Sequence, residues 1–142
     1  MFSTSHLHPM LVHFPIALVA LGFLADLLAM YFKKEVCLTK FGFYLLITGT
    51  LAALAAVFTG VFFTSEMAGA AGNVQKSHEF FAILTLCVLV VTSVLRIFLV
   101  TTKKENAKLK WLAFALYGLA AIFVCITGFF GGNLVYNYMM PL

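Results

Sequence analysis

The chain has 142 residues, of which 63% are hydrophobic and only 10% are charged. Soluble domains average about 25% charged residues, so this composition excludes an ordinary water-soluble enzyme or binding module. The formal net charge of +4 does not indicate nucleic-acid binding, because the basic residues lie beside apolar segments, where they act as signals of membrane topology. We therefore expect an integral membrane protein that binds no nucleic acid.

Four apolar segments fill the chain, at about residues 9–32, 41–64, 78–101 and 111–133. A bilayer core about 30 Å thick requires about 20 apolar residues of helix, and each segment meets that length. The connections are short, so the sequence predicts one transmembrane domain over residues 1–142 with an all-α, four-helix bundle. The first segment lacks the basic flank of a signal peptide and has too long an apolar run for one, so we expect it to be retained as a helix.

The lysines predict the orientation of the bundle. Most of them flank the first and third connections: Lys33, Lys34, Lys40, Lys103, Lys104, Lys108 and Lys110. The second connection holds only Lys76. Short loops rich in lysine and arginine stay in the cytoplasm. We therefore expect a multi-pass protein of the bacterial inner membrane with both termini outside, in contact with the lipid bilayer on all sides.

An internal duplication is indicated by two matches. When Thr59-Gly60 is set over Thr127-Gly128, Leu51-Ala52-Ala53 falls on Leu119-Ala120-Ala121. The first and third segments each carry a histidine followed by small residues at i+4 and i+7, on one helical face. These residues are His13, Ala17 and Ala20 in the first segment and His78, Ala82 and Thr85 in the third. The sequence thus predicts two helix hairpins related by a pseudo-twofold axis along the membrane normal.

The histidines are the candidate functional residues, because ionisable groups inside a membrane are costly and functional by default. His13 and His78 are expected at similar depth near the outer interface, so a twofold axis would set their imidazoles face to face. That arrangement suits the two axial ligands of one haem iron in a bundle core. Small residues would leave room for the flat ring. The haem pocket predicted in this way consists of His8, Ala17, Ala82, Gly60 and Gly128.

The leading interpretation is a membrane-bound b-type cytochrome with one haem b near the outer face. Its expected redox partner is a periplasmic cytochrome or a quinol. An iron with two histidine ligands has no open position, so electron transfer is favoured over enzymatic catalysis. The inner side offers no second histidine pair, so the protein would need a partner, such as other respiratory subunits, or would act entirely at the outer face.

Other interpretations stay open. A cluster of imidazole and carboxylate groups suits copper or zinc; its members are His6, His8, His13, His78, Glu66 and Glu79. A non-catalytic subunit of a respiratory complex would need no cofactor. Two interfacial histidines that bond to loops or lipid headgroups would need none either.

Further polar features predict local structure. Asp26 and Arg96 lie near the inner end of the bundle. They are expected either to form an ion pair with each other or to be separate, with the Arg96 side chain extending to the inner lipid headgroups. Pro15 provides no N–H, so the first helix begins near it or bends there. The connection over residues 64–77 is rich in glycine and alanine and is expected to be a linker or a flexible lid. Ser77 is the expected N-cap of the third helix.

The opening HPMLVHFPIAL, His8 to Leu18, and the close TGFFGGNLVY, Thr127 to Tyr136, resemble the ends of a bacterial family of four-helix predicted membrane proteins whose domain has no assigned function. The resemblance covers nearly the whole chain and implies a four-helix inner-membrane bundle. It also implies an association with c-type cytochrome domains and respiratory systems, which favours haem and electron transfer. The residues that match the family pattern are His8, His13, His78, Gly128, Gly131 and Gly132.

Overall fold

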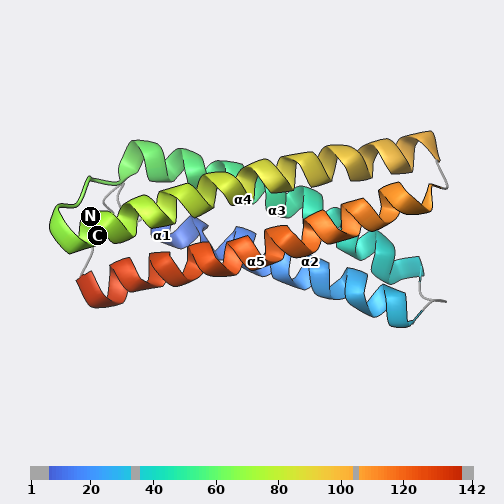
Figure 1. Cartoon of the computed structure of the whole chain (residues 1–142), viewed down its shortest axis with the longest axis horizontal. Coiled ribbons are helices and arrows are strands. Elements are labelled where there is room, and N and C mark those ends of the chain that lie inside the picture. The colour runs from blue at the N-terminus through green and yellow to red at the C-terminus, as the bar shows by residue number, and fades with distance from the viewer. Residues whose placement is uncertain (1–6, 33–35, 104–105, 139–142) are drawn as a thin grey trace.

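The structure is a computed structural model that describes residues 7–32, 36–103 and 106–138. This part of the chain forms α1 (Leu7–Leu11), α2 (His13–Tyr31), α3 (Val36–Phe63), α4 (Gly69–Thr102) and α5 (Ala107–Tyr138). Taken together, α1 and α2 make the first of four segments that are long and apolar enough to cross a membrane. The described residues contain no strand, and the all-α four-helix bundle expected from the sequence is confirmed (Figure 1).

The first span is interrupted at Val12, between α1 and α2. Pro15, the third residue of α2, has no N–H to offer to a preceding carbonyl. Two bonds keep the carbonyls of this turn satisfied, as a segment within a membrane requires. Val12 donates its N–H to the carbonyl of His8 at 3.1 Å, and Nδ1 of His13 bonds to the carbonyl of Pro9 at 2.8 Å. The structure therefore shows a break close to the position at which Pro15 predicted a helix start or a bend.

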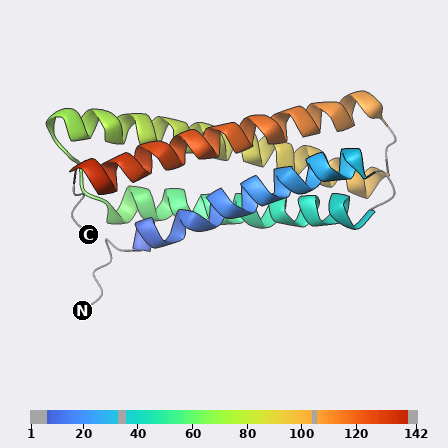
Figure 2. The same ribbon diagram turned by 90° about the horizontal axis from the view of Figure 1, so that it is seen from below.

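The helices form two hairpins. Along their lengths α2 packs against α3 and α4 against α5, and smaller contacts of α2 with α5 and of α3 with α4 join the hairpins. Figures 1 and 2 show the four long helices side by side, with α1 at the end of the bundle where α3 leads into α4. We call this end the histidine end, because it carries His8, His13 and His78. The opposite end carries the C-termini of α2 and α4.

Burial repeats from one hairpin to the other. An offset of 70 residues relates the inward positions of α1 and α2 to those of α4: His8, Pro15, Val19, Gly22 and Asp26 correspond to His78, Thr85, Leu89, Thr92 and Arg96. An offset of 71 residues relates α3 to α5: Gly42, Leu46, Gly49, Ala53 and Ala56 correspond to Ala113, Tyr117, Ala120, Val124 and Thr127. The repeat has a different register from the expected one, which set Thr59 over Thr127 and His13 over His78. Identical small and apolar residues recur by chance in such sequence, whereas burial marks the inward face directly.

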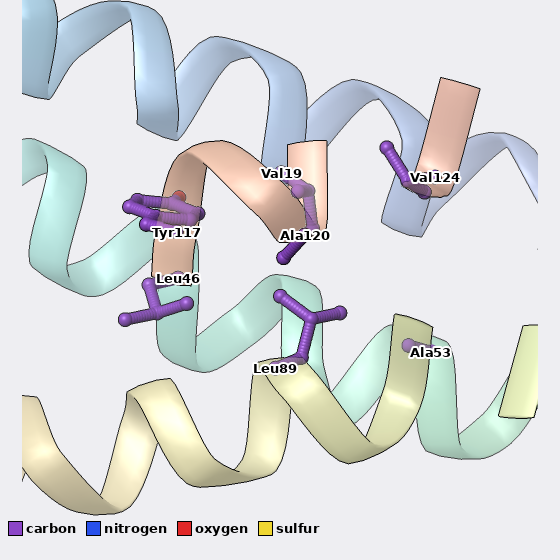
Figure 3. Packing of buried hydrophobic residues seen from close by; sticks show 7 residues of the cluster. All are labelled: Val19, Leu46, Ala53, Leu89, Tyr117, Ala120 and Val124. Carbon is purple, nitrogen blue, oxygen red and sulfur yellow. The ribbon is translucent and has the colours of Figure 1, made fainter. Parts of the chain in front are cut away.

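The core lies midway along the bundle and draws on α2, α3, α4 and α5. Its members are Val19, Leu46, Ala53, Leu89, Tyr117, Ala120 and Val124, and they meet between the helices in Figure 3. Helices in a lipid bilayer are held together by van der Waals packing, which small residues allow because the backbones can approach closely. A Cβ atom on Gly49, for example, would lie 3.0 Å from Cγ2 of Val19.

The connection between the hairpins is held against α4 instead of forming a flexible lid. The buried side chain of Gln75 accepts a hydrogen bond from the N–H of Met67 at 2.8 Å and donates one to the carbonyl of Ser65 at 3.3 Å. α4 begins at Gly69, whose φ is +65°. Ser77 is thus an interior residue of α4 that bonds to the carbonyl of Asn73, and the prediction that it caps this helix is wrong. The sequence contained no sign of the two extra helical turns before His78, because they are rich in glycine and alanine. The contacts of Gln75 help to hold these turns in place.

Candidate cofactor site

A cavity of about 340 Å³ opens at the histidine end. This volume lies in the range of about 300–1,000 Å³ that is typical of ligand sites. All five helices contribute to its wall, which is mostly apolar and rich in small residues. Its polar lining includes His8, His13, His78, Gln75 and Glu79. The cavity therefore has the character of a site for a largely apolar ligand with a few polar contacts.

His8 projects from α1 onto α3. Its Nδ1 lies 2.9 Å from the carbonyl oxygen of Ala56 and 3.3 Å from the hydroxyl of Thr59. A carbonyl oxygen can only accept a hydrogen bond, so Nδ1 carries the proton. The hydroxyl of Thr59 donates to carbonyls of its own helix at 3.1 and 3.0 Å, so it too accepts from His8. Nε2 of the neutral ring is left with its lone pair.

His78 repeats this arrangement in the other hairpin. Its Nδ1 lies 3.0 Å from the carbonyl oxygen of Thr127 on α5. Thr127 is the counterpart of Ala56 at the offset of 71 residues. Each hairpin thus directs one imidazole into the site and fixes its tautomer through a backbone carbonyl of the neighbouring helix. Ligating histidines in metal sites are oriented by the same kind of bond.

The two imidazoles lie against each other across the interface between the hairpins. The ring centroids of His8 and His78 are 6.0 Å apart, and the ring planes are at 83°. Both rings are half-buried. The structure therefore brings together one histidine from each half of the repeat.

Glycines make room for both rings. A Cβ atom on Gly60 would lie 2.9 Å from Cε1 of His8, and one on Gly131 would lie 3.2 Å from Cε1 of His78. Each glycine follows, by one helical turn, the residue whose carbonyl binds the histidine. Gly60 and Gly131 also correspond to each other in the repeat, so the same small motif has been built twice.

The other expected site residues occupy different positions. His13 lines the cavity, but its ring is exposed and its Nδ1 is bonded within its own chain segment, to Pro9. Gly60, Ala82 and Gly128 line the cavity as expected. Ala17 is exposed and lies outside the lining. His6 lies outside the described residues.

The contributions of Gly131 and of the carbonyls of Ala56 and Thr127 were missed by sequence reasoning. Backbone carbonyls leave no signal in a sequence. Gly131 did match the family pattern, and the spacing from His8 to Asp26 equals that from His78 to Arg96, at 18 residues. That equality was the available signal that His8, and not His13, is the counterpart of His78.

The described residues contain no group of three or more histidine, cysteine or acidic side chains arranged to hold a metal ion.

Fold and site together define a four-helix membrane bundle with a pair of histidines at one end. The chain belongs to the family described as Predicted membrane protein (DUF2231), whose profile matches residues 4–141. This confirms the family membership expected from the opening and closing motifs. Neither the curated proteins nor the solved structures compared with the chain gave a match.

Proposed function

We propose that the protein holds a b-type haem between His8 and His78 and transfers electrons. The observation that carries this proposal is the separation of the two rings, whose centroids are 6.0 Å apart. A metal–imidazole bond is about 2.0–2.1 Å long, and two such bonds in line, with the distance from each nitrogen to its ring centre, add up to roughly 6 Å. The separation is thus compatible with two imidazoles that would hold one metal ion.

The surroundings of the two rings also fit this cofactor. The Nδ1–H groups are already engaged by the carbonyls of Ala56 and Thr127, which leaves both Nε2 atoms as donors to a metal. Small residues of the wall give a flat ring space between the hairpins; they include Ala56, Gly60, Ala82, Gly128 and Gly131. The apolar lining would exclude water from the iron.

The proposal replaces His13 by His8 as the partner of His78. The sequence favoured His13 because the residues after it match those after His78 in spacing. In the structure the ring of His13 is exposed and bonded to Pro9, whereas the ring of His8 lies directly against that of His78. His13 remains at the cavity wall, turned to a bond within its own segment.

A haem with two histidine ligands supplies a one-electron couple and offers no open coordination position. The residues of this chain would then bind the group, fix the planes of its two ligands and keep the site dry. Electron transfer follows from that arrangement, and substrate activation does not. The protein would therefore act as a carrier between a quinol or periplasmic cytochrome and another redox partner.

The distribution of charge supports a site on the outer side of a bacterial inner membrane. At the end opposite the histidines the described residues include Lys40, Lys103, Lys108 and Lys110, whereas Lys76 lies toward the histidine end. Loops rich in lysine stay in the cytoplasm. This topology would place the cavity within reach of periplasmic electron donors and acceptors.

The test is an absorbance spectrum of the detergent-purified protein, oxidised by air and then reduced with dithionite. We expect a Soret band that shifts on reduction, with resolved α and β bands. His8→Ala and His78→Ala should each abolish the low-spin spectrum. His13→Ala is the matched control, because it removes an imidazole from the same cavity wall, and it should retain the spectrum.

Two outcomes would overturn the assignment of ligands. Full haem content with a low-spin spectrum in both His8→Ala and His78→Ala would show that neither is a ligand. Loss of the spectrum in His13→Ala with retention in His8→Ala would return the site to the pair expected from the sequence. A featureless spectrum of protein made with ample haem would overturn the haem itself and leave a cofactor-free subunit as the interpretation.

A copper or zinc site is the second candidate, and one observation favours it. His13 and Glu79 line the same cavity as His8 and His78, so a small rearrangement would offer imidazole and carboxylate donors to one ion. Metal analysis of the purified protein distinguishes the two cases. Bound copper or zinc without porphyrin, lost in His8→Ala, would support this alternative and contradict haem.

A further inference from the structure

The end of the bundle opposite the histidines contains a second pair of side chains from the same two segments. Arg96 of α4 donates two hydrogen bonds to the carboxylate of Asp26 on α2, at 2.7 and 3.0 Å. The Asp26 side chain is 5% exposed and that of Arg96 14%. This geometry is a bidentate pair, which fixes direction as well as distance.

The pair and the histidines lie on one face of each segment. Asp26 lies 18 positions after His8, and Arg96 lies 18 positions after His78. On the continuous helix α4, at about 3.6 residues per turn, this spacing is about five whole turns, or about 27 Å along the axis. The segment from His8 to Asp26 has the same number of positions but is interrupted at Val12. Val19 and Leu89 fall between them at equivalent positions, and both belong to the central core cluster.

α2 and α4 have few direct contacts with each other apart from the ion pair. The principal partner of α2 is α3 and that of α4 is α5. In a membrane the hydrophobic effect does not drive one helix against another, because lipid tails are as apolar as the side chains, so polar contacts contribute to the register beside van der Waals packing. A bidentate ion pair has only one good geometry, so a shift of either hairpin would leave charges uncompensated at depth.

We propose that the Asp26–Arg96 pair sets the register between the two hairpins and thereby holds His8 opposite His78. Asp26 and Arg96 are thus positioning residues for the site at the other end of the bundle. The pair acts through the inward faces of the two segments rather than through contact with the cofactor. The functional meaning of this inference rests on the proposed haem site, whereas its test reads distances in the protein alone.

Two exposed residues near the histidine end allow that reading. Met10 and Phe80 are equivalent positions at the offset of 70 residues, and they are 57% and 63% exposed. Spin labels on Met10→Cys and Phe80→Cys, in a chain whose native cysteines Cys37, Cys87 and Cys125 are replaced by serine, report the distance between the two segments by double electron–electron resonance. We expect one narrow distance distribution.

Single substitutions of the ion pair should broaden or shift that distribution. Asp26→Asn and Arg96→Gln each remove one charge, and each should also lower haem affinity. The double variant with Asp26→Arg and Arg96→Asp reverses the pair. It should restore the narrow distribution. Ser93→Ala is the matched control, because it removes a different polar contact between the hairpins, and it should leave the distance unchanged.

An unchanged distribution in Asp26→Asn and Arg96→Gln would overturn the inference. If the single variants fail to fold, the reversed pair decides: a folded double variant with a broad or shifted distribution would overturn it equally. Changed distances in a protein that binds no haem would support the positioning role while refuting the proposed cofactor. Unchanged distances in a protein that binds haem through both histidines would refute the positioning role while supporting the proposed cofactor.

Discussion

Gly60 is in van der Waals range of the imidazole of His8: a Cβ atom built on this glycine would lie 2.9 Å from Cε1 and 3.2 Å from Nδ1 of the ring. Real Cβ atoms do not approach other atoms so closely, and the ring is also held by its bond to Ala56. The missing side chain of Gly60 is therefore a condition for the position of His8.

Gly60→Ala should displace the His8 ring and lengthen its bond to Ala56. We expect haem affinity to fall about tenfold or more, as for other changes to groups that orient metal ligands. The measurement is haem content and low-spin absorbance of the purified variant. Alanine favours helix over glycine by about 1 kcal/mol, so a loss of cofactor cannot be attributed to a weaker helix.

Gly132→Ala is the control for that experiment. Gly132 lines the same cavity, but a Cβ atom there would have no atom within 4 Å. Its spectrum should match that of the unmodified protein. Equal haem content in Gly60→Ala and Gly132→Ala would contradict the role assigned to Gly60.

Tyr117→Phe should stabilise the bundle. Tyr117 is fully buried, and its hydroxyl has no hydrogen-bond partner within the part of the chain that the structure describes. An unpaired buried polar group costs about 1–3 kcal/mol, so its removal should raise the free energy of unfolding by about 1 kcal/mol. Thermal unfolding in detergent shows whether the free energy of unfolding rises or falls. Tyr117→Ala should instead lower the free energy of unfolding by about 3–5 kcal/mol, because it leaves a cavity. A lower stability of Tyr117→Phe would reveal a partner for the hydroxyl, such as an internal water.

Gln75→Leu should free the connection between the hairpins. The change removes the acceptor of the Met67 N–H and the donor to Ser65, and a broken buried bond costs about 1–3 kcal/mol. Hydrogen exchange at Met67 should accelerate about tenfold, which corresponds to about 1.4 kcal/mol. Ser77→Ala, which removes a bond inside α4 only, should leave that exchange rate as it was. Equal rates in Gln75→Leu and the unmodified protein would show that other contacts hold this connection.

The hydroxyls of Thr50 and Ser93 meet between α3 and α4 at 2.8 Å, and we expect their coupling to be small. Hydrogen bonds between membrane helices average about 0.6 kcal/mol in double-mutant cycles. A cycle of Thr50→Val and Ser93→Ala, followed by unfolding in detergent, should give a coupling energy of that order. A value above about 1.7 kcal/mol would mean that this contact, and not only the ion pair, aligns the hairpins.

The four-helix fold was predictable because a membrane span has a strong signal in composition and length. The residues at which the helices begin and end were less predictable. The extra turns of α4 before His78 begin with Gly69, Ala70, Ala71 and Gly72, which carry no apolar periodicity. The bonds of Gln75 that secure these turns involve residues of the preceding connection. The Asp26–Arg96 contact was one of two arrangements predicted for these residues, and the structure shows it.

The candidate site was predictable only in outline. The sequence indicated histidines at one end, a repeat and small residues around them. It favoured His13 over His8 because the small residues after His13 match those after His78 in spacing. The break at Val12 leaves no signal in the sequence that shows how the segment is turned. The register of a repeat in such apolar sequence is defined by which residues face inward, and that becomes visible only when both hairpins are packed together.

The division of contacts between and within the hairpins has a consequence for how the protein is made. Contacts between neighbours in sequence form fastest, so each hairpin is expected to assemble as it leaves the ribosome, and the two to dock afterwards. A half-synthesised chain then holds Asp26 without Arg96 and His8 without His78. Docking completes the charge pair and the candidate site in one event, so cofactor loading would report the last step of biogenesis.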